Sequence, residues 1–191
     1  SSEIAAYYSD YDDFIETVVT KKVGGTTHYS NVNLDSATIK GIEFSNTLLW
    51  DVLVGAPEGI STHFVASYTE GEDGNGNALN SVNPWSAVLG LNYDAPNQNW
   101  GTSLKLNYTA DKSGSDINFD DESGGNAGQA ELPSATVVDL TAYYKPIKDL
   151  TIRGGVFNLT NEEYYRWNDI RGDDELYKEN SQAERNYGIS A

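Results

Sequence analysis

The segment 132–171 decides the fold, and it reads LPSATVVDLTAYYKPIKDLTIRGGVFNLTNEEYYRWNDIR. Two runs within it, 137–144 and 150–156, alternate between apolar and polar residues. Because successive side chains of a strand point to opposite faces, each run predicts a strand with one apolar face and one mostly polar face. The connection between the two runs, KPIKD, is short enough only for antiparallel neighbours.

The rest of the chain repeats this plan, which gives about eight predicted strands. Besides the two runs above they cover 2–14, 29–51 (with Gly41 as a candidate bulge), 60–70, 84–94, 100–108 and a partial strand around Tyr187 and Ile189. The predicted connections alternate in length: those near 55, 96 and 147 are short, and those near 20, 75, 120 and 170 are long. Short periplasmic turns and long extracellular loops are typical of outer-membrane barrels. We therefore predict an all-β fold, an antiparallel transmembrane β-barrel segment.

Composition favours a barrel wall over a sandwich. Only 38% of the 191 residues are hydrophobic, and a barrel with a wet interior needs apolar residues only on its outer face. Ten aromatic residues near predicted strand ends could form girdles at the edges of a membrane, although Tyr and Trp also favour strands in general. They are Tyr7, Tyr8, Tyr29, Trp50, Tyr68, Trp85, Tyr93, Trp100, Tyr108 and Tyr144.

Charged residues fix the register of the central strands. A Lys on the lipid face at mid-membrane costs about 2–4 kcal/mol. We therefore expect Leu104 and Leu106 to face lipid and Lys105 to face the lumen, with Asp139 and Arg153 also pointing inward.

Charge and residue content exclude several functions. The net charge of −17, from 29 acidic and 12 basic residues, argues against nucleic-acid binding. The chain has no Cys, which excludes disulfides and Cys nucleophiles, and no nucleophile elbow, so no enzyme is predicted. No stretch reaches the roughly 18 apolar residues of a membrane-spanning helix, so any crossing must use strands. The chain also lacks Met, and we interpret it as a fragment or a processed product.

Three motifs in order resemble the TonB-dependent outer-membrane receptors. The segment 137–165, with its Gly-Val-Phe-Asn-Leu string, resembles the C-terminal signature of that family. The segment 31–43 is similar to the family's Asn-x-x-x-Ala-x-Ile-x-Gly-x-Glu strand, and 8–16 is similar to the strand end before it. The string 165–172, YRWNDIRG, further resembles the branch that binds haem, haemoglobin or transferrin.

The resemblance carries several expectations. It implies a barrel of about 22 strands, of which residues 1–191 would be the C-terminal portion, without the plug domain and the upstream strands. It also implies an outer-membrane location in a Gram-negative bacterium and energy from a TonB–ExbB–ExbD system acting through the plug. The ligand would be an iron source, haem or a haemoprotein, with haem as cargo and no resident cofactor.

Candidate ligand-binding residues lie in two of the long loops. The last long loop combines aromatic residues with Arg, the composition of binding hot spots, in Tyr165, Arg166, Trp167 and Arg171. The alternative is a capping loop folded over the rim. An exposed His28 in the first long loop could reach haem iron, although a single His more often has no such role. We expect His63 on the lumen face, with a hydrogen-bonding role.

No metal site is predicted. Acidic pairs could offer oxygen ligands to Ca²⁺, but solvated loop charge is the favoured interpretation. These pairs are Asp12/Asp13, Asp120/Asp121 and Asp173/Asp174.

Two other functions stay open. One is a receptor of the same architecture for a siderophore or another nutrient. The other is a complete eight-stranded barrel with a structural or adhesion role, which about eight strands could close.

Overall fold

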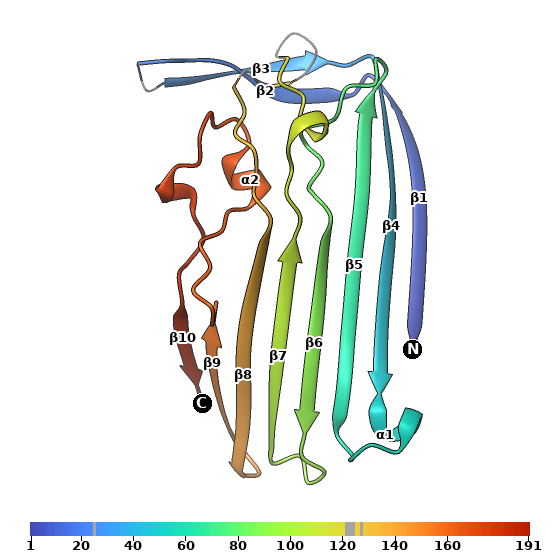
Figure 1. The fold of residues 1–191 in the computed structure, drawn as a ribbon, viewed down its shortest axis with the longest axis vertical. Coiled ribbons are helices and arrows are strands. Elements are labelled where there is room, and N and C mark those ends of the chain that lie inside the picture. The colour runs from blue at the N-terminus through green and yellow to red at the C-terminus, as the bar shows by residue number, and fades with distance from the viewer. Residues whose placement is uncertain (25, 121–124, 127) are drawn as a thin grey trace.

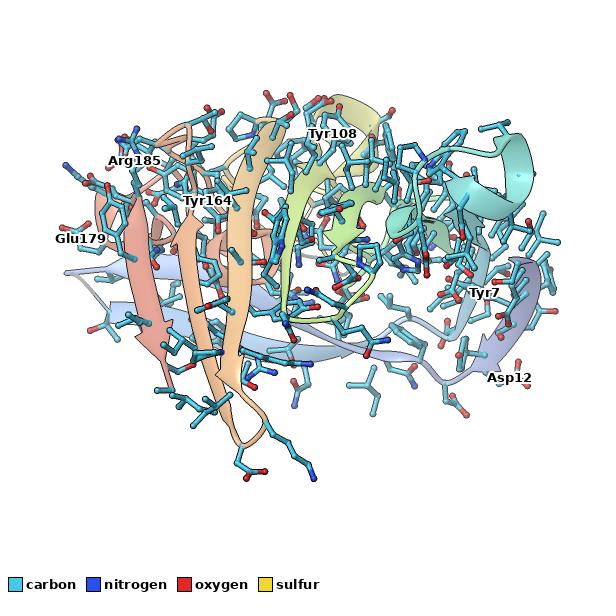
Figure 2. All side chains as sticks on the ribbon, turned by 90° about the horizontal axis from the view of Figure 1, so that it is seen from below. Tyr7, Asp12, Tyr108, Tyr164, Glu179 and Arg185 are labelled. Carbon is cyan, nitrogen blue, oxygen red and sulfur yellow. The ribbon has the colours of Figure 1, made fainter. Side chains whose placement is uncertain are left out.

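Eight strands form one antiparallel sheet in the computed structural model, which describes residues 1–24, 26–120, 125–126 and 128–191. The spatial order is β1 (Ser2–Asp12), β4 (Ser36–Leu49), β5 (Ile60–Asp73), β6 (Ser86–Asp94), β7 (Trp100–Thr109), β8 (Ala135–Ile147), β9 (Leu150–Phe157) and β10 (Asn186–Ser190). Figure 1 shows them as a tall wall. In Figure 2, β1 with Tyr7 and Asp12 lies at one side and Arg185, just before β10, at the other. The wall is therefore open, and it does not form the closed eight-stranded barrel considered above.

The predicted strand 29–51 is wrong in one respect, because it comprises three elements. β3 (Thr26–Asn33) and β4 are separate strands, and α1 (Trp50–Val54) is a short helix. The break lies at Asp35, which adopts a positive φ of 52°, and its N–H bonds the side chain of Asn33 at 3.1 Å. Only Leu34 and Asp35 separate β3 from β4, so the sequence resembles one extended run.

The first predicted loop is mostly strand. β2 (Ile15–Val23) pairs with β3 as a two-stranded hairpin that is separate from the wall. Figure 1 shows the hairpin crossing the upper ends of the wall strands.

The connections alternate in length as predicted. At the lower end, residues 95–99 and 148–149 join neighbouring strands, and α1 with residues 55–59 joins β4 to β5. The upper connections are long and contain η1 (Gly114–Asp116), α2 (Trp167–Ile170) and η3 (Lys178–Asn180). None of the described helices is both long and apolar enough to span a membrane.

The apolar side chains form rows across one face, which confirms the predicted register. Leu104 lies between Leu91 of β6 and Leu140 of β8. Leu140 stays 38% exposed, because no second layer covers this face. Lys105 lies on the opposite, polar face, directly across from Asp139.

Aromatic residues lie near both ends of the apolar face. At the lower end Trp100 pairs with Tyr144 across strands, and at the upper end the rings of Trp85 and Tyr108 are 4.9 Å apart. Two predicted girdle residues are elsewhere. Tyr29 belongs to the hairpin. Tyr7 lies on the polar face, next in register to Gly41.

Gly41 is not a bulge, because β4 pairs without a shift with both neighbours there. Instead it makes room for the ring of Tyr7, whose hydroxyl bonds Thr69 Oγ1 at 2.6 Å. A Cβ at Gly41 would lie only 2.4 Å from the oxygen of that hydroxyl.

Candidate functional site

The upper connections pack against one another and form a small core of their own, which we call the cap. Its segments are β2 and residues 74–85, 110–134 and 158–185, within the described parts of the chain. Its apolar centre consists of Ile117, Leu132, Tyr165, Trp167 and Ile170. Val18 of the hairpin and Leu79 are also buried. The sequence thus places its most buried side chains in the loops rather than in the wall.

Buried amides join three of the loops. Trp167, 2% exposed, donates its indole N–H to the carbonyl of Asn80 at 2.7 Å. The side chain of Asn80 in turn donates to the Asn118 carbonyl at 2.7 Å and accepts from the Asn118 N–H at 3.0 Å. Buried polar groups are costly unless paired, so this network holds the loops in one arrangement.

A second set of amides docks the hairpin onto the cap. The N–H of Val19 donates to the side chain of Asn126 at 2.7 Å. Gln129 links the same region to the last loop, since it donates to the Ile170 carbonyl at 3.1 Å and accepts from the Gly172 N–H at 2.6 Å. The loop 110–134 therefore links the hairpin to the loop that carries α2.

One buried carboxylate lies where the hairpin meets the loops. Glu16 is 3% exposed, and its Oε2 accepts from Ser81 Oγ at 3.3 Å. Its Oε1 lies 3.9 Å from Nη1 of Arg171 and has no hydrogen-bond partner among the described residues. Burial raises the pKa of Glu16, and the positive charge of Arg171 opposes that shift.

A buried ammonium lies close by. Lys112 is 5% exposed, donates to the Val82 carbonyl at 2.7 Å and lies 4.9 Å from the ring centroid of Trp167. Burial lowers its pKa to about 8, although the carboxylates of Asp116 and Glu16 oppose the shift. The cation–π contact, the bond to the carbonyl and these two carboxylates stabilise the charge inside the cap.

One segment of the cap, the loop 158–185, also lies against the polar face of the wall. Asn158 joins them: its N–H donates to Asp139 Oδ1 at 2.9 Å, and its side-chain amide donates to the Glu162 and Ala183 carbonyls at 2.8 and 3.2 Å. Between loop and wall lies a recess of about 710 Å³. Its lining includes Lys105, Asn107, Phe157, Tyr164, Arg166 and Asp169. Ligand pockets are commonly of this size.

The predicted binding residues have different surroundings. Tyr165 and Trp167 are buried and line the recess, while Arg166 is exposed there. Arg171 is half-buried and faces Glu16. His28 is exposed on β3, opposite Lys21, and is not part of the recess lining. Burial of Trp167 favours the capping-loop interpretation, whereas the ligand contacts of all five residues stay predictions.

The other candidates from the sequence are His63 and the acidic pairs. His63 lies on the polar face, and its Nδ1 is 3.0 Å from Thr47 Oγ1, as predicted. The described residues contain no group of three or more His, Cys, Asp or Glu side chains arranged for a metal ion. Asp121, one member of the acidic pairs, lies outside the described residues.

Sequence reasoning missed the buried charges. Glu16 and Lys112 occur in stretches rich in Asp and Glu, where a charged residue is normally solvated. No local pattern separates them from their neighbours, since their burial results from contacts between distant loops.

Comparison with known proteins gives a consistent picture. The family model for the β-barrel of TonB-dependent receptor-like proteins matches residues 1–159. The chain is 35% identical over 150 residues to hemoglobin-haptoglobin utilization protein B of Neisseria meningitidis, covering 75% of this chain and 18% of that protein. It is 31% identical over 181 residues to hemoglobin-binding protein A of Haemophilus influenzae, covering 86% of this chain and 18% of that protein. The chain thus spans about a fifth of the length of these curated relatives.

Solved structures share the fold. The copper transporter OprC superposes with a TM-score of 0.72 at 18% identity, covering 97% of this chain and 27% of that one. The FrpB iron transporter from Neisseria meningitidis superposes with a TM-score of 0.68 at 15% identity, covering 98% and 28%. In both, the similar region is about a quarter of a longer chain.

Proposed function

The chain belongs to the TonB-dependent receptor family, and we propose that the whole receptor takes up haem, or haem from a haemoprotein such as haemoglobin, across the outer membrane of a Gram-negative bacterium. Residues 1–191 would supply the C-terminal part of the barrel wall and its extracellular cap. A plug domain elsewhere in the receptor would receive energy from TonB, ExbB and ExbD.

One observation carries the choice of ligand. The relatives above are named for haemoglobin or for haemoglobin–haptoglobin, and their similarity to this chain extends over most of its length. The solved structures support the fold alone, since their identities are below one fifth.

The cap suits a binding role rather than a catalytic one. Its polar groups are mostly committed to hydrogen bonds between loops, and this arrangement would present a preformed surface to a large ligand. In our proposal, the exposed Arg166 and His28 contact the ligand, whereas Tyr165, Trp167 and Arg171 hold the loops in place. Direct contact through Trp167 would require the cap to rearrange.

Growth of an indicator strain tests the proposal. The full-length receptor is expressed in a Gram-negative strain that lacks its own haem receptors and cannot synthesise haem, and haemoglobin is supplied as the only haem source. Growth is expected, and it should disappear when the strain lacks TonB. Absence of growth on haemoglobin and on free haem, with the receptor present in the outer membrane, would contradict the proposal.

The alternative cargo is a ferric siderophore, which the same architecture could carry. Supplying ferric siderophores to an iron-starved, siderophore-deficient strain with this receptor separates the two. Growth on a siderophore but not on haem would favour the alternative.

A further inference from the structure

The recess between the loop 158–185 and the polar face of the wall combines features that the buried core of the cap lacks. It is open, unlike the cap core, and it contains two cations, Lys105 of β7 and Arg166 of the loop. Both side chains are exposed. Among the described residues, neither forms an ion pair.

The nearby carboxylates are already engaged. Asp139 is directly across from Lys105 in register, but its Oδ1 accepts from the Asn158 N–H at 2.9 Å and its Oδ2 accepts from Asn107 Nδ2 at 3.1 Å. Asp169 accepts from Gln182 Nε2 at 2.8 Å. The recess therefore contains two cations that have no carboxylate within ion-pair distance among the described residues, beside two carboxylates that bond the loop or the wall.

The rest of the lining combines aromatic and apolar residues with neutral polar side chains such as Asn83, Asn107 and Thr109. Phe157 and Tyr164 present ring surface, and Pro84 and Ala135 add apolar contacts. An aromatic lining next to two cations matches a flat apolar molecule that carries carboxylates, because such a molecule places its ring system on the aromatics and its charges on the cations.

We propose that this recess binds a carboxylate-bearing planar ligand of the porphyrin class, with Lys105 and Arg166 as partners of its carboxylates. The inference deepens the proposed uptake of haem and rests on it. Haem carries two propionate groups on an apolar ring, and the recess likewise combines two cations with aromatic surface. None of the described lining residues is His, so in this proposal the recess recognises the carboxylates and other groups contact the iron.

Binding of two probes to the full-length receptor in lipid nanodiscs tests the proposal. The probes are haem and haem dimethyl ester, in which the propionates are neutral, and the Soret absorbance reports binding. The variants are Lys105→Gln, Arg166→Gln and the double variant. Lys148→Gln is the matched control, because Lys148 is an exposed cation in the turn between β8 and β9, at the other end of the wall.

Each single variant is expected to weaken haem binding about threefold, and the double variant about tenfold, as for exposed charged contacts. Affinity for the dimethyl ester should be the same in the native receptor and in all variants, and the control should match the native receptor with both probes.

Three results would overturn the proposal. Haem affinity that is unchanged in the double variant shows that the recess does not bind the carboxylates, and uptake of haem by the receptor can still stand. Equal losses for haem and its ester show a general disturbance of the loop. A native receptor that supports no growth on haem and binds neither probe removes the proposed function together with this site.

Discussion

At the scale of single residues, the contacts of Asn158 give a structural role to the Asn of the Asn-Leu string. It adopts a positive φ of 53°, is 2% exposed and ends β9. Its side chain accepts from the Glu162 N–H at 2.8 Å and donates to two carbonyls. One short polar residue thus turns the chain and fastens both ends of the last loop.

Replacing Asn158 tests this role. Asn158→Ala is expected to destabilise the loop by about 3 kcal/mol, because buried partners lose their bonds and Ala tolerates a positive φ poorly. Asn158→Gly keeps the backbone conformation, so its effect should be about 1 kcal/mol smaller. Limited proteolysis of the loop 158–185 in the full receptor measures both. Equal resistance of the Ala variant and the native receptor would contradict the assignment.

The burial of Lys112 predicts that the stability of the cap depends on pH. Its pKa in the folded cap is about 8, below the 10.5 of an exposed lysine. Between these values the unfolded cap binds more protons, so the stability contributed by this residue rises with pH from about 8 to 10.5. Lys112→Met should remove that rise and keep the contact with Trp167.

Thermal melting of the cap, followed by tryptophan fluorescence across this pH range, measures the effect. The matched control is Lys148→Met, which changes a lysine in an exposed turn. If the native receptor and the Lys112→Met variant have the same pH profile, the buried-ammonium account is wrong.

At the scale of elements, the hairpin β2–β3 depends on a close contact with the loop after α2. Gly172 has a φ of +94°, and a Cβ there would lie 2.5 Å from Cγ2 of Val19. The hairpin can pack against this loop only because position 172 lacks a side chain.

Variants at two glycines distinguish the cost of overpacking from the cost of a strained backbone. Gly172→Ala is expected to undock the hairpin and cost about 1–3 kcal/mol by overpacking, in addition to the cost of a positive φ. Gly128→Ala is the control, since Gly128 also has a positive φ, of 69°, but its Cβ would meet only the Asp174 Cβ at an ordinary 3.7 Å. Hydrogen exchange of the hairpin amides should rise in the first variant and much less in the second. Similar exchange in both would exclude the packing contribution.

At the scale of the whole molecule, the wall has two free edges. β1 pairs only with β4 and β10 only with β9 in the described sheet. Unpaired edges in a membrane leave backbone groups without partners, which is why barrels close. In the described sheet, β1 and β10 do not pair with each other.

The chain 1–191 expressed alone is therefore expected to associate through its edges rather than stay monomeric. Size-exclusion chromatography with light scattering in detergent measures this, with the full-length receptor as the control. A folded, monodisperse monomer of the 191-residue chain would show that the edges are tolerated.

Sequence patterns predicted the wall well and the cap poorly. Alternation placed Leu104 and Lys105 on opposite faces, because side-chain direction along a strand is a local property. The turn at Asp35 was not predicted, because it interrupts the strands by only two residues. The recess that combines Lys105 with Arg166 could not be predicted, since it depends on the way the last loop folds back onto the wall.

The sequence by itself determined which residues share the apolar face of the wall, which connections are long and which family the motifs resemble, because period-two alternation and turn residues act over a few neighbouring positions. Only the tertiary structure decided that Glu16, Lys112 and Trp167 meet inside one cap and that Lys105 lies beneath it. Those contacts join residues many tens of positions apart, and each is stabilised by desolvation and pairing that exist only once the loops have come together.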